Sequence, residues 1–149
     1  MSASLHLARA EDLDRLITLA KAFYAEEGLQ GTDEARRNAL APLLDGSPHG
    51  AAYLIGPARA PIGYVVVTFG WSVEFGGLDA MIDEIYLRPA VRGRGIATEV
   101  LLSLAKALQE AGVAALHLEV AADNDKAQRL YARAGFQQRD RYMLMSRRL

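Results

Sequence analysis

The sequence Arg92-Gly93-Arg94-Gly95-Ile96-Ala97 is a basic turn with two glycines, and it lies between two regular segments. Residues 81–87 before it have a strand-like pattern, and residues 96–108 after it have a helix-like pattern. Glycines let a backbone bend closely around a ligand, and the first amides of a helix have no acceptor within the helix. We therefore expect the turn to bind a diphosphate group at the positive end of the helix dipole.

The spacing of the glycines excludes two other kinds of phosphate-binding loop. A P-loop requires Gly-x-x-x-x-Gly-Lys-Ser/Thr, and the chain contains no such run. A dinucleotide-binding loop requires a third glycine, but Thr98 stands at that position, and residues 88–91 separate the glycines from the strand. The turn therefore needs a different explanation.

The composition is that of one globular domain over residues 1–149, since 51% of the residues are hydrophobic and 23% are charged. A net charge of −1 provides no overall positive potential that would attract the phosphates of nucleic acid. No apolar run approaches the length of a membrane span. The chain has no cysteine, and its three histidines lack ligand spacing, so we expect no metal site. The sequence predicts a cytoplasmic protein without nucleic-acid or membrane partners.

Hydrophobic periodicity predicts two helices, a meander of antiparallel strands, and a strand-helix-strand crossover whose two strands are parallel. A further helix and one strand complete the chain. The expected elements are, in order, a short strand over 5–7, helices over 11–27 and 34–44, strands over 51–55, 62–71 and 80–87, a helix over 96–108, a strand over 113–120, a helix beginning near 124 and a strand over about 142–148.

Three motifs in this order resemble those of the GNAT superfamily of N-acetyltransferases. Its signature Gln/Arg-x-x-Gly-x-Gly/Ala is met by Arg92, Gly95 and Ala97, and residues 82–89 resemble the strand that precedes it. Residues 124–136 are similar to the family's Asn-x-x-Ala-x-x-Leu-Tyr-x-x-x-Gly-Phe helix, and residues 9–13 look like its opening strand-to-helix turn. The resemblance covers essentially the whole chain. It implies an α/β fold of the α+β type, with a central mixed, mostly antiparallel sheet, a parallel crossover, and helices on both faces.

The resemblance also implies acetyl-CoA as co-substrate. The loop amides would bind its diphosphate, the arginines of the loop would add charge, and the backbone of the preceding strand would pair with the pantetheine amides. The asparagine at the start of the last helix would bond the pantetheine arm or only cap the helix. The cofactor-binding residues expected on this basis are Ile85, Tyr86, Leu87, Arg92, Gly93, Arg94, Gly95, Ile96, Ala97, Thr98 and Asn124.

An amine acceptor creates a need for a base. If its pKa is that of lysine, roughly 10.4, holding it neutral at pH 7 costs about 4.6 kcal/mol, so a carboxylate must help remove the proton. Asp83 and Glu84 are the candidates. Because a strand alternates, only one of them faces the groove unless a bulge intervenes. The resemblance favours Asp83, whereas Glu84 has the longer reach, and either could be a solvated charge on an edge strand.

The resemblance assigns Tyr131 as the acid that protonates the leaving thiolate of the coenzyme, although Tyr131 also lies on an apolar helix face and could belong to the core. The chain has no cysteine, which excludes an acyl-cysteine intermediate, so direct transfer is expected. Tyr24, Glu27 and Trp71 fall in segments that border the acceptor in the family. Alternatively, Glu27 lies in solvent at the end of a helix, and the two aromatic side chains only contribute to packing.

Acidic residues near the expected acceptor side favour a cationic small-molecule amine, such as a polyamine or an aminoglycoside, or else a lysine side chain. A protein or peptide acceptor would use the same fold, and a non-catalytic module that only binds acyl-CoA for regulation is the alternative of another class. The tail has room for one strand where the family usually has two. A partner subunit could therefore complete the sheet, and a homodimer is a possible assembly.

Overall fold

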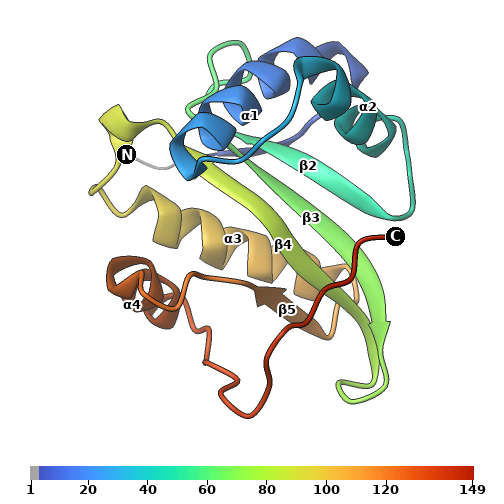
Figure 1. Cartoon of the computed structure of the whole chain (residues 1–149), viewed down its shortest axis with the longest axis vertical. Coiled ribbons are helices and arrows are strands. Elements are labelled where there is room, and N and C mark those ends of the chain that lie inside the picture. Colours follow the sequence, from blue (N-terminus) through green and yellow to red (C-terminus); the bar gives the residue numbers. More distant parts are fainter. Residues whose placement is uncertain (1–3) are drawn as a thin grey trace.

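The computed structural model describes residues 4–149 and contains one sheet of five strands (Figure 1). The strands follow one another in chain order across the sheet, and each neighbouring pair is antiparallel except β4 and β5, which are parallel. This confirms the expected mixed, mostly antiparallel sheet. The strands are β1 (Leu5–Leu7), β2 (Gly50–Ile55), β3 (Gly63–Ser72), β4 (Gly77–Leu87) and β5 (Ala115–Leu118).

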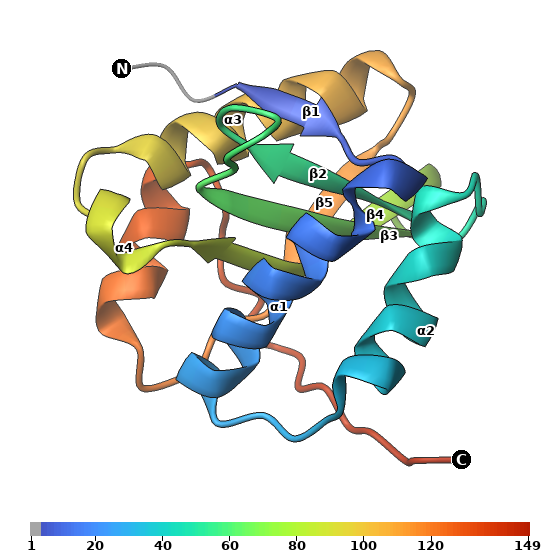
Figure 2. The ribbon, with the colours of Figure 1, turned by 90° about the horizontal axis from the view of Figure 1, so that it is seen from above.

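The helices lie on both faces of the sheet, as expected. Figures 1 and 2 show α1 and α2 on one face and α3 and α4 on the other. Their bounds are α1 (Leu13–Glu27), α2 (Asp33–Leu44), α3 (Ile96–Glu110) and α4 (Asp125–Arg133), and short 3-10 turns, η1 (Ala10–Asp12) and η2 (Pro89–Val91), precede α1 and α3. Among the described residues, no helix has both the length and the apolar character needed to cross a bilayer.

Strand β3 divides the hydrophobic core into two layers because its side chains alternate between the faces. Tyr64 and Val66 pack in the cluster that contains the residues of α1 and α2, whereas Val65 and Val67 pack in the cluster that contains the residues of α3. All four side chains are buried. Burial of each such apolar side chain contributes about 1.5–3 kcal/mol to folding, so β3 is the strand that fixes the position of both layers.

The strand expected over about 142–148 is wrong, because the structure has no strand after α4. Arg139 gives a physical reason. Its guanidinium binds both carboxylate oxygens of Glu74 at 2.8 and 2.9 Å, and it lies over the rings of Phe75 and Tyr142. These contacts tie the beginning of the tail to the turn between β3 and β4, so the tail does not pair with β5. The strand expected over 113–120 is correspondingly short, and it pairs only with β4 within residues 4–149.

Candidate active site

A β-bulge in β4 brings two carboxylates to the same face of the sheet. Val66 of β3 pairs with Glu84, but the next residue, Val67, pairs with Ile82, so Asp83 has no partner across the ladder. The extra residue reverses the alternation of side chains along β4. Such a bulge is the condition under which both carboxylates can share a side, and the structure contains it.

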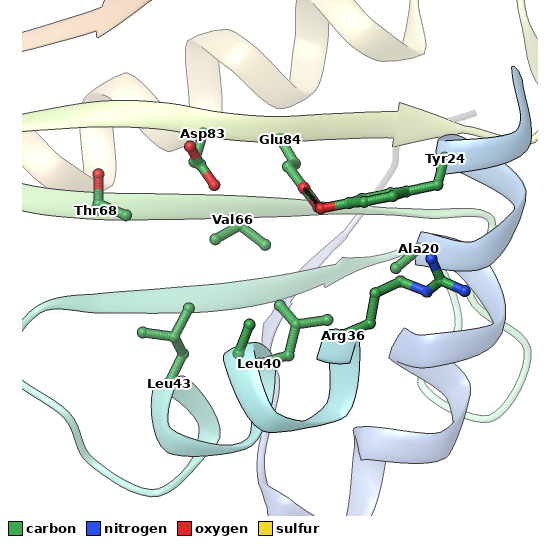
Figure 3. Close-up of a pocket in the computed structure, with 10 residues that line it drawn as sticks. Ala20, Tyr24, Arg36, Leu40, Leu43, Val66, Thr68, Asp83 and Glu84 are labelled. Carbon is green, nitrogen blue, oxygen red and sulfur yellow. Dashed lines mark hydrogen bonds between the residues drawn. The ribbon is translucent and has the colours of Figure 1, made fainter. Parts of the chain in front are cut away.

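The neighbouring residues confirm the effect of the bulge. Ile82 and Ile85 are three positions apart, yet both pack in the core layer of α3. The two residues between them, Asp83 and Glu84, both line a pocket on the opposite face, under α1 and α2 (Figure 3). A regular strand would have sent one of these carboxylates into the layer of α3, where burial of an unpaired charge is costly.

Two tyrosines hold the carboxylate of Glu84. The Tyr24 hydroxyl donates to Oε2 at 2.9 Å, and the Tyr64 hydroxyl donates to Oε1 at 2.9 Å. Burial raises the pKa of Glu84 above its ordinary value, the two phenol hydrogen bonds lower it in part, and the charge of Asp83 raises it further. Burial and the charge of Glu84 raise the pKa of Tyr24 to about 12 and also raise the pKa of Tyr64. At neutral pH both phenols therefore remain protonated donors.

Two cavities meet at this pair of carboxylates. The first, which we call the acceptor pocket, has a volume of about 110 Å³ and lies between α1, α2 and the sheet (Figure 3). It is lined by Ala20, Tyr24, Arg36, Ala39, Leu40, Leu43, Val66, Thr68, Asp83 and Glu84. The second, which we call the interstrand groove, has a volume of about 170 Å³. It is lined by Phe23, Glu27, Ile82, Asp83, Glu84, Ile85, Leu118, Glu119, Val120, Ala121, Asn124, Ala127 and Tyr131.

The interstrand groove exists because β4 and β5 separate. Their pairing ends at Ile82 and Leu118, whereas β4 continues to Leu87 and stays paired with β3 on its other side. The backbone of β4 after the bulge therefore has no partner in β5, although the Leu87 carbonyl accepts a hydrogen bond from Arg92. This segment contains Ile85, Tyr86 and Leu87, the residues that the family resemblance implies for the pantetheine arm.

The glycine turn has an open backbone. Gly93 and Gly95 have φ angles of 79° and 78°, in the left-handed region that favours glycine, and a Cβ atom added at either position would have no neighbour within 4 Å. The first amide of α3 that bonds within the helix is that of Glu99, which donates to the Gly95 carbonyl at 3.1 Å. The amides from Gly93 to Thr98 precede it and have no acceptor in the helix, so they can bind an anion.

The two arginines of the turn differ in their surroundings. Arg92 donates from Nε to the Leu87 carbonyl at 2.9 Å, pairs with Glu26 at 2.7 Å, and lies over the Tyr86 ring. It therefore connects the turn to β4 and to the end of α1. Arg94 is exposed and lies in the turn between the two glycines. The guanidinium with freedom to reach a phosphate is thus that of Arg94.

Asn124 and Tyr131 both line the interstrand groove. The Asn124 side chain accepts a hydrogen bond from the Ala127 amide at 3.1 Å, so it caps α4, which was one of the two roles considered for it. Tyr131 is half-buried and packs edge-on against Phe136. Burial, and secondarily the charge of Glu27, raise the pKa of Tyr131. Its hydroxyl is therefore protonated at neutral pH and can donate a proton into the groove.

The three residues assigned to the acceptor do not come together. Tyr24 lines the acceptor pocket, Glu27 lines the interstrand groove, and Trp71 lines neither cavity and is 74% exposed at the far end of β3. Two residues of the acceptor pocket region were missed. Tyr64 lies within an apolar run that is typical of a core strand, and Arg36 lies in a helix of weak amphipathicity. Nothing local to either residue indicates its contact with β4 or α1.

Comparison with known proteins agrees with this geometry. The model of the Acetyltransferase (GNAT) family matches residues 13–136. A protein of Bacillus subtilis strain 168, "Uncharacterized N-acetyltransferase YycN", is 37% identical over 71 residues, which are 48% of this chain and 44% of that protein. The chain therefore matches less than half of that relative's length.

Solved structures extend the similarity to the whole chain. The integron cassette protein HFX_CASS3, from the mobile metagenome of Cole Harbour Salt Marsh, is 31% identical, with a TM-score of 0.85 over 97% of this chain and 90% of that one. A "predicted acetyltransferase with acetyl-CoA" from Clostridium acetobutylicum is 19% identical, with a TM-score of 0.78 over 97% of this chain and 96% of that one. At this identity the second match shows a shared fold.

Proposed function

The chain belongs to the acetyltransferase (GNAT) family, and we propose that it transfers the acetyl group of acetyl-CoA directly to a primary amine of a small molecule. The observation that carries this proposal is the meeting of two cavities at Asp83 and Glu84. The interstrand groove suits the pantetheine arm of the coenzyme, and the acceptor pocket suits the amine. The carboxylates at their junction stand where a proton must leave the amine.

The residues of the chain fit acetyl-CoA as the donor. The free amides between Gly93 and Thr98 would bind the diphosphate, and Arg94 would add a positive charge. The backbone from Ile85 to Leu87 would pair with the pantetheine amides in the interstrand groove, in the manner of an added strand. The shared fold with the C. acetobutylicum structure, which is a structure with acetyl-CoA, supports acetyl-CoA as the co-substrate. Bound acetyl-CoA supplies an activated carbonyl carbon for attack by the amine.

Glu84 is the group that we assign as general base. A base works best when its pKa approaches the working pH, and burial raises the pKa of Glu84. Within residues 4–149, each of its oxygens accepts one phenol hydrogen bond and keeps a lone pair free. Asp83, which is exposed, adds negative charge that attracts an ammonium group. The family resemblance favoured Asp83 as the base, whereas the surroundings of the two carboxylates favour Glu84.

The transfer then balances in protons and bonds. The ammonium group would give one proton to Glu84, which passes it to solvent. The neutral nitrogen would then form a bond to the acetyl carbon and give its second proton to Glu84, while the bond from that carbon to sulfur breaks. Tyr131, which lines the groove, would give its hydroxyl proton to the leaving sulfur. Because the pKa of Tyr131 is raised, the phenol is protonated before each turnover. Solvent returns a proton to the tyrosine and removes one from Glu84.

The Tyr64→Phe variant should move the acid limb of the pH profile of kcat/KM to higher pH. The Tyr64 hydrogen bond lowers the pKa of Glu84, so its loss raises that pKa further. A base loses activity as pH falls through its pKa, and in the variant this loss begins at a higher pH. Tyr53→Phe is the control, because burial alone raises the pKa of Tyr53. If the acid limb of the kcat/KM profile lies at the same pH in Tyr64→Phe and in Tyr53→Phe, the role of Glu84 as base is contradicted.

Release of free coenzyme A tests the proposed function. Purified protein with acetyl-CoA should release coenzyme A faster when primary amines are added, and mass spectrometry should find the acetylated amines. If the protein binds acetyl-CoA but no small amine or peptide accepts the acetyl group, the chain is a regulatory acyl-CoA-binding module. If only peptides accept it, the alternative acceptor class is the right one.

We also propose that two copies of the chain associate through the tail and the turn between β3 and β4. Large apolar side chains are exposed there, including Val73 at 90%, Met143 at 85% and Met145 at 85%. Exposed apolar patches and free sheet edges favour association. Light scattering of the chromatographed protein should give the mass of a dimer, and a chain ending at Arg141 should give a monomer. A monomeric full chain would contradict this assembly.

A further inference from the structure

The side chain of Arg36 is a buried cation that the proposed reaction does not use. It is only 9% exposed. Its Nη1 donates to the Gly31 carbonyl at 3.2 Å, and its Nη2 pairs with Asp33 at 2.6 Å. Its Nε–H is buried and has no hydrogen-bond acceptor within residues 4–149. The charged end of Arg36 is therefore enclosed by the chain itself and is not free for a ligand.

Such a residue contributes little to the stability of a core. A buried donor without an acceptor is unfavourable, and hydrophobic side chains of similar volume often replace a buried ion pair without loss of stability. Asp33, the partner of Arg36, is 54% exposed, so it would remain solvated if the arginine were replaced. The fold alone therefore gives no reason for an arginine at this position, and its neighbours in the site become the place to look for one.

The contact of Arg36 that reaches the site is with Tyr24. The Cζ atom of the guanidinium lies over the Tyr24 ring, 5.1 Å from its centre, and the Tyr24 hydroxyl donates to Glu84 at 2.9 Å. Figure 3 shows Arg36 extending from α2 toward α1, from which Tyr24 projects. Gly31, between the two helices, lies against both side chains, because a Cβ added there would be 3.4 Å from Nη1 of Arg36 and 3.8 Å from the Tyr24 ring. Arg36 thus joins α2 and the connection to α1 with the ring that holds Glu84.

Tyr24 needs such support more than Tyr64 does. Tyr64 is 0% exposed and lies on β3, between β2 and β4. Tyr24 is half-buried in the last turn of α1, and residues 28–32, which follow that helix, are exposed. Helix ends fray, and segments with few buried contacts open locally more often than a central strand does. A cation over the Tyr24 ring restrains the less secure of the two tyrosines.

We propose that Arg36 is a positioning residue of the transfer: its guanidinium fixes the Tyr24 ring, and the fixed ring keeps its hydroxyl bonded to Glu84. This inference rests on the proposed function, because Glu84 is the base of that reaction. The bond from Tyr24 stabilises the ionised carboxylate, which is the form that takes a proton from the amine. Without Arg36 the bond is made for a smaller fraction of the time, and less of the base is ionised at a given pH.

The effect of Arg36 on Glu84 adds to the effects of the other titratable groups nearby. The groups that line a cavity with Glu84 or bond to it come from every neighbouring element, and they are Tyr24 and Glu27 of α1, Arg36 of α2, Tyr64 of β3, Asp83 of β4, Glu119 after β5 and Tyr131 of α4. Among these groups Arg36 is the only cation. Burial, the largest influence, raises the pKa of Glu84, and the charge of Arg36 lowers it in part. Loss of Arg36 therefore raises the pKa of Glu84 by loss of charge and by a looser Tyr24, and the experiment has to separate the two.

The first experiment titrates Glu84 directly and needs no acceptor. Carbon NMR of protein labelled at the glutamate side-chain carboxyls follows the ionisation, and Glu84→Gln identifies the signal. We expect Arg36→Met to raise the pKa of Glu84 and Arg37→Met to leave it unchanged. Arg37 is the next residue of α2, but it pairs at the surface with Asp14 at 2.8 Å and does not line the pocket. An unchanged titration in Arg36→Met would overturn the inference.

The Tyr24→Phe background separates positioning from charge. In this background no hydroxyl remains to be positioned, so Arg36→Met acts on Glu84 only by removing a charge. The shift of the Glu84 titration on Arg36→Met should therefore be smaller in Tyr24→Phe than in the unmodified protein. Equal shifts in the two backgrounds would mean that Arg36 acts by its charge alone, and the positioning role would be wrong.

The pH profile of kcat/KM gives the effect on the reaction. Below the acid limb, Arg36→Met should lose about 2- to 5-fold or more, the worth of one cation–π contact, and well above the limb it should lose little. The pKa of the amine is the same for every variant, so a difference between variants belongs to the protein. An equal loss at every pH would contradict the inference.

The melting temperature shows whether Arg36 serves the fold instead. Because Asp33 stays solvated and an unsatisfied donor is removed, Arg36→Met should melt within about 4 °C of the unmodified protein. Arg36→Met that fails to fold, or that melts far lower, would mean that the arginine is there for stability, and the inference would be wrong.

Failure of the inference is distinguishable from failure of the proposed function. If amines are acetylated but Arg36→Met changes neither the Glu84 titration nor the acid limb, only the role of Arg36 is wrong. If the titration responds as expected but neither an amine nor a peptide releases coenzyme A from acetyl-CoA, the contact from Arg36 through Tyr24 to Glu84 is confirmed. The proposed transfer is then wrong, and the role of Arg36 in that transfer is overturned with it.

Discussion

The Glu84→Gln variant should lose about 10²- to 10⁴-fold in kcat, the usual contribution of a general base, while its affinity for acetyl-CoA stays unchanged. Glutamine has nearly the same shape, its carbonyl oxygen can accept the hydrogen bond from one of the two tyrosines, and its NH2 group can donate to the hydroxyl oxygen of the other, so the pocket keeps its geometry. What it cannot do is take a proton from the ammonium group of the acceptor. Steady-state kinetics with a saturating amine, together with calorimetry of coenzyme binding, measures both quantities.

Asp83→Asn is the matched comparison for this prediction. Asp83 lines both cavities but is exposed, and no tyrosine holds it. Its loss should mainly raise KM for a cationic amine, because a screened charge at the surface has a small effect. If instead Asp83→Asn has the larger loss in kcat and Glu84→Gln is nearly active, Asp83 is the base and the tyrosine pair has only a structural role.

The Gly95→Val variant should weaken coenzyme binding about 5- to 30-fold. Gly95 has a φ angle of 78°, a conformation that costs a residue with a side chain about 1–2 kcal/mol. If the turn changes shape to escape this strain, the same free energy is lost from coenzyme binding, which raises the dissociation constant about 5- to 30-fold. A changed turn would no longer direct its amides toward one point. Since a Cβ at this position has no neighbour within 4 Å, the expected loss comes from the backbone and not from a collision with protein atoms.

Gly112→Val is a matched control, because Gly112 has a φ angle of 94° and likewise no neighbour within 4 Å of a Cβ. It follows α3 at the end opposite the glycine turn. The control should lower the melting temperature without changing the dissociation constant for coenzyme A. Equal affinity in Gly95→Val and the unmodified protein would mean that the turn does not bind the coenzyme.

Local patterns in the sequence were enough to predict most of the fold. The apolar stripe of residues 96–108 predicted α3, the glycine turn before it was expected from its spacing, and the order of strands and helices predicted a crossover with parallel strands. Each of these features depends on residues that are close in sequence. The opening between β4 and β5 was not predicted from these patterns, because the strand expected over 113–120 is longer than β5, which ends at Leu118 before β4 does.

The parts of the site that the sequence did not predict depend on contacts between distant residues. The bulge at Asp83 is a property of how β3 and β4 pair, and no residue type marks it. The bond from Tyr64 to Glu84 crosses from one strand to the next, and Arg36 reaches the pocket only because α2 packs beside α1. A buried tyrosine or arginine has the same local sequence whether it serves the core or a site.

In the tail, secondary structure also depends on contacts between distant residues, which the local sequence does not reveal. Tyr142, Met143 and Leu144 have strand-forming or apolar side chains, and the sequence alone favours a strand there. A strand also needs a neighbour, and the bonds from Arg139 to Glu74 direct the tail elsewhere. Strand formation in the tail is therefore decided by tertiary contacts.

A crystal structure of the protein with acetyl-CoA is the most direct test of the central claim, that the coenzyme lies between β4 and β5 with its thioester at the junction of the two cavities. We expect the diphosphate to contact amides between Gly93 and Thr98, and the sulfur to lie near Tyr131 on the side of Glu84. A coenzyme bound elsewhere, or a thioester separated from Glu84 by closed protein, would contradict the claim.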